Sequence, residues 1–302
     1  MIGIPLGYAA GQFGSDLGVT AIKFASVRGQ RLVEHIAELG YDLKDYGDVN
    51  VIQPQKVAEK EENPKYLQEM IASCQNMAED IGKILADGAI PVIIGGDHSI
   101  AMGTLSGISK YYKDRDKDLG LIWFDAHADM NTPETSPSGN IHGMPLAVLL
   151  GYGAPQLTHI ADFSPKLDPA LSVHIGARDI DRDERELVRK LGIRFMTMRE
   201  IDERGMSACI DEAIEIASRA SGGYAVTFDV DALDPGDAPG SGTLVRGGLT
   251  YREAHLAMEK IADAGGMRSL EVVEINTALD INNKTAELGV ELILSALGKT
   301  IL

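Results

Sequence analysis

Residues Leu119–Asp129 read LGLIWFDAHAD, an apolar run that ends abruptly in two aspartates and a histidine. The apolar part, Leu119–Phe124, has the length of a strand and is bounded by aspartate on both sides. Consecutive apolar positions are typical of a parallel strand that is covered on both faces. The polar side chains that follow would lie at the carboxyl end of the strand, where open α/β sheets bind ligands. This stretch therefore predicts an α/β fold and marks its ligand-binding edge.

Short apolar runs and helical patterns alternate along the rest of the chain. Further strands are predicted at Met1–Gly7, Ile90–Ile94, Val173–Ile175, Ala225–Phe228 and Leu270–Ile275. Helices are predicted at Pro64–Ala86, Ser207–Ser218, Tyr251–Ala264 and Lys284–Leu297, the first of them opening on its proline. This alternation predicts a three-layer αβα sandwich around a mostly parallel sheet. We expect one domain that spans residues 1–302.

The composition excludes several classes of protein. The 302 residues are 44% hydrophobic and 24% charged, a globular balance that argues against disorder, collagen and coiled coils. The net charge of −17 argues against nucleic acid or an anionic membrane as a partner. Two cysteines, Cys74 and Cys209, are too few for a disulfide scaffold or a zinc ribbon. Because we find neither a signal peptide nor an apolar run of about 20 residues, we expect a soluble, cytoplasmic protein.

Two more segments place acidic or imidazole side chains directly after a predicted strand. Gly95–Ser99 reads GGDHS, and Phe228–Pro235 reads FDVDALDP. In DAHAD and at Asp229 and Asp231 of FDVDALDP, aspartate or histidine recurs at every second position, so a continued strand would point each set to one face. The candidate ligands are His98, Asp125, His127, Asp129, Asp229 and Asp231.

Four carboxylates that converge on a buried place require positive charge, because desolvating each ionised group costs several kcal/mol. Two divalent cations would neutralise them, and two neutral imidazoles would complete the coordination. Oxygen and nitrogen ligands without thiolate favour Mn²⁺, with Co²⁺, Ni²⁺ or Fe²⁺ as substitutes. Each motif alone is also typical of an ordinary strand end or loop, but the three together predict a metal site.

The motifs GGDHS, DAHAD and FDVDALDP resemble the three signatures of the arginase/agmatinase ureohydrolase family, and the resemblance extends to the closing stretch Lys284–Leu302. It implies an α/β sandwich, a binuclear manganese cluster held by the six residues above, and a homo-oligomer, either a trimer or a hexamer. It also implies hydrolysis of a guanidinium compound by a hydroxide that bridges the two metal ions. In that reaction Asp129 would pass a proton to the departing amine.

Residues 130–143 (MNTPETSPSGNIHG) are similar to the loop of the arginase branch of the family. The resemblance implies that Asn131 and Ser138 hold the α-carboxylate of L-arginine and that Ser136 assists through water. We therefore expect hydrolysis of L-arginine to L-ornithine and urea. An agmatinase or guanidinobutyrase, whose substrate has no α-amino acid carboxylate, is the alternative within the family. A non-catalytic, metal-stabilised binding subunit is the alternative from another class.

The roles of several other residues are implied only by the resemblance. Asp181, assisted by Glu184, matches the position that binds the α-ammonium, although the residues alone are typical of a solvated charged loop. Thr243 also matches a family position, and Glu274 matches the carboxylate that holds the guanidinium, where the local alternative is an ordinary strand-end carboxylate. His142 matches a flexible proton-relay histidine, whereas a lone histidine between glycine-bearing turns is more often a packing residue.

The chain departs from the family pattern at three positions that usually hold proline, namely Val19, Leu244 and Thr277. The segment Gly11–Gly14 (GQFG) also lacks the basic residues that are common there. None of these is a candidate ligand. We expect them to change loop geometry, subunit contacts and substrate affinity rather than the chemistry.

Overall fold

The centre of the molecule is a seven-stranded sheet with the order β1-β4-β9-β8-β5-β6-β7, in which every neighbouring pair is parallel. The computed structural model describes residues 1–59 and 62–300, so Ile301 and Leu302 of the closing stretch lie outside the described residues. The strands are β1 (Ile2–Ile4), β4 (Val92–Gly95), β5 (Gly120–Phe124), β6 (Ser172–Ala177), β7 (Arg194–Thr197), β8 (Tyr224–Asp229) and β9 (Met267–Val273). A separate antiparallel pair joins β2 (Ser26–Val27) to β3 (Gln30–Arg31).

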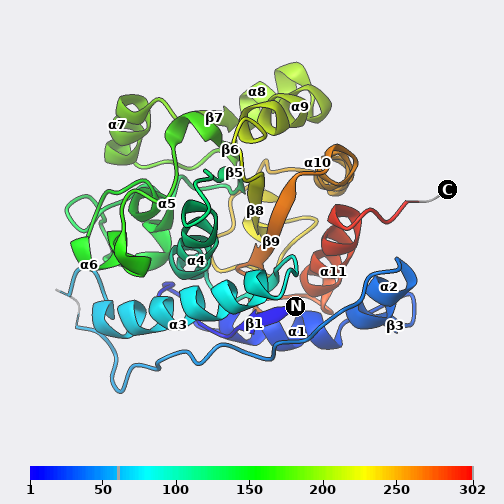
Figure 1. Ribbon diagram of the computed structural model, residues 1–302, viewed down its shortest axis with the longest axis horizontal. Helices are drawn as coiled ribbons and strands as arrows, with labels where there is room; N and C mark the ends of the chain where they lie inside the picture. Colours follow the sequence, from blue (N-terminus) through cyan, green and yellow to red (C-terminus); the bar gives the residue numbers. More distant parts are fainter. Residues whose placement is uncertain (60–61, 301–302) are drawn as a thin grey trace.

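Helices cover both faces of this sheet (Figure 1). One layer holds α3 (Leu67–Ala86), α4 (Ala101–Lys113), α5 (Pro145–Leu149), α6 (Pro155–Thr158) and α7 (Arg182–Leu191). The other holds α1 (Gly18–Phe24), α2 (Leu32–Glu38), α8 (Met198–Arg204), α9 (Met206–Ala217), α10 (Tyr251–Ala264) and α11 (Lys284–Ala296). The three-layer αβα sandwich is therefore confirmed. Among the described helices, none combines the length and the apolar character that a membrane crossing requires.

The two apolar cores explain why β5 is apolar at every position. Leu121 and Trp123 pack into the core beneath α3 and α4, whereas Ile122 and Phe124 pack into the core on the opposite face. All four side chains are fully buried. A strand with a core on each face has no solvent side, so its sequence cannot alternate between apolar and polar residues.

The structure adds helices α1, α2, α4, α5, α6, α7 and α8 to the predicted ones, and it differs from the prediction at strand β7 and at the start of α3. Strand β7 was not predicted, because it is a short edge strand whose Arg194 and Phe195 are only half-buried. The predicted helix start at Pro64 is wrong, since α3 begins at Leu67. Before it, Tyr66 has a left-handed backbone (φ 56°), and the Lys65 N–H donates to the Gly139 carbonyl. Residues 64–66 thus contact the loop that follows DAHAD instead of adding a first turn to the helix.

The strand order brings distant segments of the sequence to one edge of the sheet. The carboxyl ends of β4, β9, β8, β5 and β6 lie next to one another in that order. These are the ends followed by GGDHS, Glu274, the second half of FDVDALDP, DAHAD and the segment of Asp181. The topology therefore assembles one site from five parts of the chain.

Candidate metal centre

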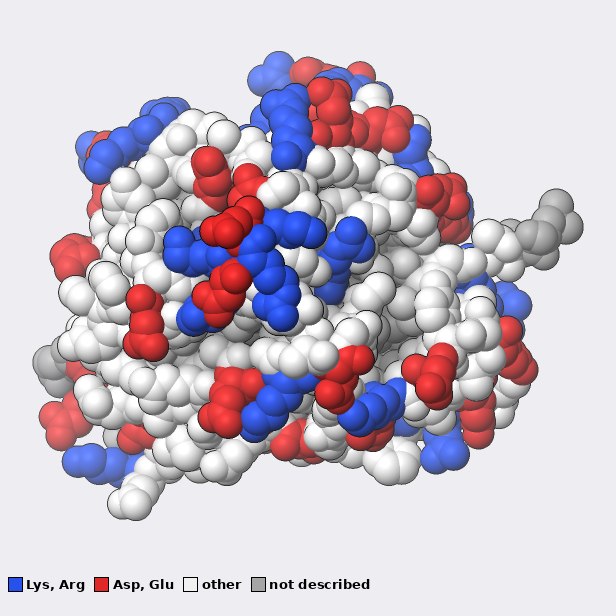
Figure 2. Space-filling view, viewed as in Figure 1, with Lys and Arg blue, Asp and Glu red and all other residues white. Residues whose placement is uncertain are grey.

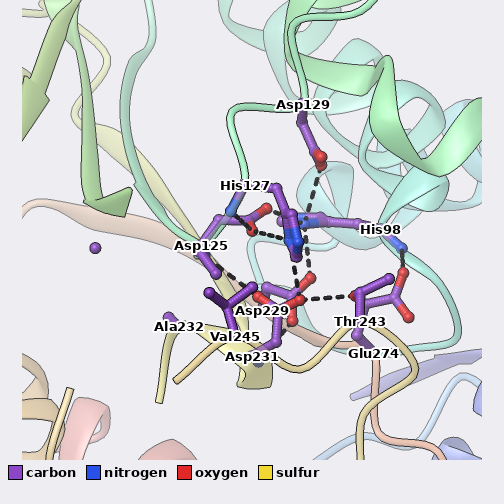
Figure 3. Close-up of polar contacts among 12 residues, drawn as sticks. His98, Asp125, His127, Asp129, Asp229, Asp231, Ala232, Thr243, Val245 and Glu274 are labelled. Carbon is purple, nitrogen blue, oxygen red and sulfur yellow. Dashed lines mark hydrogen bonds and ion pairs between the residues drawn. The ribbon is translucent and has the colours of Figure 1, made fainter. Parts of the chain in front are cut away.

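The six candidate ligands lie together at this edge, with their side chains directed toward one another (Figure 3). His98 Nδ1 lies 3.0 Å from Asp125 Oδ2 and 3.3 Å from both Asp129 Oδ2 and Asp229 Oδ2. His127 Nδ1 lies 3.1 Å from Asp231 Oδ2 and 3.4 Å from Asp125 Oδ1. Four carboxylates and two imidazoles thus share one small volume.

The convergence does not arise from continued strands, as the spacing of two had suggested. Strand β5 ends at Phe124, Asp129 has a left-handed backbone (φ 54°), and Asp231 lies in a 3₁₀ turn at Val230–Ala232. In DAHAD, Asp125 Oδ1 accepts a hydrogen bond from the His127 N–H at 2.7 Å. In FDVDALDP, Asp229 Oδ1 accepts one from the Asp231 N–H at 2.8 Å. These Asx turns bend the chain after each strand and return the next side chain to the same site.

A third Asx turn reveals a residue that the sequence analysis left without a role. Asp97 Oδ1 accepts from the Ser99 N–H at 3.1 Å, and its Oδ2 accepts from the Ala9 N–H at 3.0 Å. The side chain is fully buried, and burial followed by repulsion from Glu274 raises the pKa of Asp97 to about 7. In the sequence, the sign of such a role is the position of Asp97 in GGDHS, one residue before the candidate ligand His98. Asp97 fixes the turn that presents His98.

The ligand atoms form two groups that could each hold a cation. One group is His98, Asp125 and Asp229, and the other is Asp125, His127 and Asp231, with all candidate atoms of a group within 4.8 Å of one another. Asp125 belongs to both groups, which is the arrangement of a carboxylate shared between two adjacent ions. Asp129 belongs to neither group, but its Oδ2 is buried and has no hydrogen-bond partner among the described residues. A bound cation would satisfy that oxygen.

The electrostatics of the cluster also favour bound cations. Burial, and then repulsion from Asp125, raises the pKa of Asp129 well above its usual range. Burial and the neighbouring Asp231 do the same for the pKa of Asp229. Burial alone would lower the pKa of His98, but Asp125 and Asp229 raise it well above the ordinary value. The cluster therefore has too little positive charge of its own to keep all of its carboxylates ionised. Its oxygen and nitrogen donors fit divalent transition-metal ions, which would supply that charge.

Buried polar residues behind the ligands hold them in place. His98 Nε2 lies 3.0 Å from Thr227 Oγ1, which in turn donates to Glu271 Oε1 at 3.0 Å. Because the Thr227 hydroxyl donates its proton in a hydrogen bond to Glu271, its oxygen can accept a hydrogen bond from His98 Nε2–H. The lone pair of His98 Nδ1 then faces the carboxylates. Trp123 stacks on the His98 ring at a centroid distance of 4.1 Å and donates to Asp125 Oδ2. The spacing analysis found none of these residues, because their roles depend on contacts between strands.

Arg178, which follows β6, is another residue without a predicted role. Its guanidinium donates to the carbonyl oxygens of Asp231 at 2.6 Å and Val245 at 2.7 Å. It thereby joins the turn that carries Asp231 to the loop that carries Thr243. Thr243 Oγ1 completes this link by donating to Asp231 Oδ2 at 2.8 Å.

A pocket of about 180 Å³ opens onto the cluster. It is lined by His98, His127, Asp129, Asn131, His142, Gly143, Asp179, Asp181, Glu184, Asp229 and Thr243. The lining contains five carboxylates and three imidazoles but no lysine or arginine. Such a pocket attracts a cationic ligand. Asp179 was not predicted, although it stands in the same segment as Asp181.

The structure separates the predicted substrate-binding residues, together with the predicted proton-relay residue His142, into two sets. Asn131, His142, Asp181, Glu184 and Thr243 line the pocket, but Ser136 and Ser138 do not. The Ser136 hydroxyl accepts from the Gly139 N–H at 2.9 Å, and the exposed Ser138 accepts from the Asn140 N–H at 3.2 Å. Both serines therefore shape the loop in this state, and direct contact of Ser138 with a ligand stays a prediction.

Asp181 and Glu184 lie at the start of α7 rather than in a solvated loop. Asp181 is the residue before the first turn, and its N–H donates to Glu184 Oε2 at 2.8 Å. Glu184 Oε1 accepts from the Met130 N–H at 2.9 Å, so this buried carboxylate connects α7 to the loop after DAHAD. The capping box fixes the exposed Asp181 at the pocket mouth.

Glu274 lies beneath the pocket, not among its lining residues. It is buried, it has a left-handed backbone (φ 64°), and its Oε1 accepts from the His98 N–H at 2.9 Å. The same oxygen lies 3.0 Å from His142 Nδ1. Burial alone would lower the pKa of His142, but the Glu274 carboxylate raises it. His142 therefore contacts both the pocket and the buried carboxylate.

The three departures from the family pattern lie away from the candidate ligands. Val19 is buried in α1 and packs into the core beside α11. Leu244 is 41% exposed directly after the pocket residue Thr243, and Thr277 is half-buried in the turn after β9. Of the three, Leu244 is adjacent in sequence to a residue that lines the pocket.

Removing bound metal is expected to destabilise the fold, because it exposes the four buried carboxylates to one another. With Mn²⁺ at about 1,000 times its dissociation constant, the gain in stability is about 4 kcal/mol, or a rise of about 5–10 °C in Tm. Scanning calorimetry of EDTA-treated protein, with and without added Mn²⁺, measures this shift. Asp125→Asn removes the shared carboxylate and should abolish most of it. Equal Tm values with and without Mn²⁺ would contradict the metal assignment.

The comparisons with known proteins agree on one family. The model of the arginase family matches residues 1–298. The arginase of Bacillus subtilis is 45% identical over 302 residues, with 100% of this chain and 98% of that protein covered. The arginase of Brevibacillus brevis is 44% identical with the same coverage. The crystal structure of the arginase from Bacillus caldovelox is 42% identical, has a TM-score of 0.91, and covers 100% of this chain and 98% of its own.

Proposed function

Because the chain belongs to the arginase family, we propose that it hydrolyses L-arginine to L-ornithine and urea. The observation that carries the proposal is the acidic pocket that leads to the cluster of four aspartates and two histidines. An arginine side chain ends in a cation, which suits this pocket. Its α-ammonium suits the aspartates at the mouth.

We propose that two Mn²⁺ ions occupy the cluster, with Co²⁺ or Ni²⁺ as substitutes. The residues that would hold them are His98, Asp125, His127, Asp129, Asp229 and Asp231. Two observations support two ions: Asp125 belongs to both ligand groups, and Asp129 Oδ2 has no hydrogen-bond partner within residues 1–59 and 62–300. When bound, such ions lower the pKa of a coordinated water and supply a nucleophile near neutral pH.

The chain's own groups would then orient the guanidinium and move protons. Glu274 is buried and acidic, so it would bind the guanidinium and present its carbon to the nucleophile. Asp129 lines the pocket beside the cluster and would transfer a proton to the departing amine. His142 contacts Glu274 and lines the pocket, so it would exchange protons with solvent.

The mouth of the pocket, away from the metal cluster, would bind the amino-acid part of the substrate. Asp181 and Glu184 add negative charge there, which suits an α-ammonium, while Asn131 offers a neutral amide to the α-carboxylate. Thr243 would support the wall through its bond to Asp231. Ser138 and, through water, Ser136 would assist Asn131.

Asn131→Ala is expected to raise KM for L-arginine about tenfold with little change in kcat. The amide contacts a part of the substrate that does not react, so its loss weakens the binding of the substrate and of the transition state equally. Steady-state kinetics with L-arginine measure both constants, and Asn140→Ala, in the same loop, is the control. An unchanged KM would mean that the α-carboxylate is held elsewhere.

The reaction is tested by incubating the manganese-loaded protein with L-arginine and, in parallel, with agmatine. The proposal predicts urea and ornithine in equal amounts from L-arginine and little urea from agmatine. A preference for agmatine would support the agmatinase alternative, which the similarity to arginases and the position of Asn131 in the pocket argue against. Metal binding without turnover of any guanidine would support the non-catalytic alternative.

We also propose a cytoplasmic homo-oligomer, either a trimer or a hexamer, with a small-molecule substrate and no nucleic-acid or membrane partner. Phe13 and Phe24 are each 67% exposed, which is consistent with burial in a subunit contact. Acidic and basic side chains intermingle on the face shown in Figure 2, which does not favour a nucleic-acid backbone. Light scattering at several protein concentrations measures the oligomer.

A further inference from the structure

The side-chain amide of Asn131 can face the pocket in two ways that differ only in which atom is presented. The residue is 8% exposed and lines the pocket. With its nitrogen toward a ligand carboxylate the amide donates a hydrogen bond, but with its oxygen there it repels the carboxylate. Recognition of an α-carboxylate therefore depends on what fixes this orientation.

Thr135, four residues further along the loop, contacts the oxygen of that amide. Its hydroxyl accepts from the Thr132 N–H at 2.8 Å. The single hydroxyl proton can then go to Asn131 Oδ1 at 3.0 Å or to the Thr132 carbonyl at 3.4 Å. The shorter contact is the better hydrogen bond, so Thr135 donates to Asn131.

The other end of the amide is fixed by an acceptor. Asn131 Nδ2 donates to Asp181 Oδ2 at 3.0 Å, which uses one of its two N–H bonds. A flipped amide would set its oxygen against the Asp181 carboxylate and lose the Thr135 donor. The second N–H remains for a ligand in the pocket that Asn131 lines.

We propose that Thr135 is a positioning residue for substrate selection: it orients the Asn131 amide so that an N–H faces the α-carboxylate of the substrate. This inference rests on the proposed function. Thr135 itself need not touch the substrate, because it acts through Asn131. It makes the pocket selective for guanidino compounds that carry an α-carboxylate over their decarboxylated counterparts.

The role of Thr135 is tested with a variant that removes the side-chain hydroxyl and keeps the shape of the side chain. Thr135→Val removes the donor, Thr135→Ser retains it, and Thr132→Val removes a neighbouring hydroxyl that does not contact Asn131. Thr135→Val is expected to raise KM for L-arginine about fivefold to tenfold with kcat within about twofold. The variant loses the hydrogen bond that orients the Asn131 amide, and this amide contacts a part of the substrate that does not react. Thr135→Ser and Thr132→Val should stay near the wild-type KM.

Calorimetric binding of L-ornithine and of 1,4-diaminobutane, which lacks the carboxylate, separates this inference from the proposed function. Thr135→Val should weaken L-ornithine about fivefold to tenfold and leave 1,4-diaminobutane unchanged. Equal weakening of both ligands, or no change in either, would overturn the role of Thr135. Absence of urea from the wild-type protein with L-arginine would instead overturn the proposed function, while the ratio of the two binding constants would still report on Thr135.

Discussion

Replacing Asp129 by alanine is expected to lower kcat for L-arginine at least about a thousandfold. Two losses combine in this variant: the proton acceptor, whose contribution is typically 10²–10⁴-fold, and one of the carboxylates proposed to hold the metal ions. The buried Asp129 Oδ2 lies beside His98 and has no hydrogen-bond partner among the described residues, which supports the metal-holding role, and the side chain lines the pocket, which supports the role in proton transfer. Steady-state kinetics and the manganese content per chain are measured on the same preparation, and the metal content should fall.

Two further variants separate the chemistry from the fold. Asp129→Asn keeps the shape of the side chain but cannot accept the proton, so it should also be nearly inactive. Asp168→Ala removes an aspartate that accepts from the Ala170 N–H at a remote 3₁₀ turn, and it should keep wild-type activity. Near-wild-type turnover by Asp129→Ala with a full complement of manganese would refute the role of this residue.

Glu274→Gln is expected to lower kcat/KM for L-arginine about 10²–10³-fold while the manganese content stays unchanged. The glutamine can still accept from the His98 N–H, but it no longer carries the charge that pairs with a buried guanidinium. Losing one partner of a buried ion pair costs about 3–5 kcal/mol, and each 1.36 kcal/mol corresponds to a factor of ten. Because Glu274 belongs to neither ligand group, its loss should not release metal.

Kinetics and metal analysis of this variant are compared with Glu253→Gln, which changes a carboxylate in the first turn of α10. The control should resemble the wild-type protein in both measurements. If Glu274→Gln kept the wild-type kcat/KM, the guanidinium would be bound by one of the carboxylates that line the pocket instead. If it lost manganese, Glu274 would support the metal centre instead of the substrate.

Much of the fold could be predicted because its central strands are buried on both faces. Such strands are continuous apolar runs, and the polar residues after them stand out in the sequence, as Phe124-Asp125 and Phe228-Asp229 show. The edge strand β7 has no such signal, since Arg194 and Phe195 remain partly exposed. The start of α3 was misplaced because residues 64–66 contact a distant loop, which overrides the local preference for proline in a first helical turn.

The candidate ligands could be identified by spacing, but the reason for their convergence could not. A strand period and an Asx turn both return every second side chain to one place, and only the structure distinguishes them. The supporting residues have no sequence signal, because Thr227, Glu271 and Arg178 act through contacts between separate strands and loops. The resemblance supplied roles for Asn131 and Asp181, whereas their mutual hydrogen bond emerged only from the fold.

Metal ions in this cluster are proposed to drive the hydrolysis of L-arginine. A titration of EDTA-treated protein with Mn²⁺, with urea release from L-arginine and from agmatine followed in parallel, tests this dependence. We expect no urea without metal, activity that rises to saturation at two Mn²⁺ per chain, and a strong preference for L-arginine throughout. Urea release that is independent of added metal, or the absence of urea from L-arginine with two Mn²⁺ bound, would contradict it.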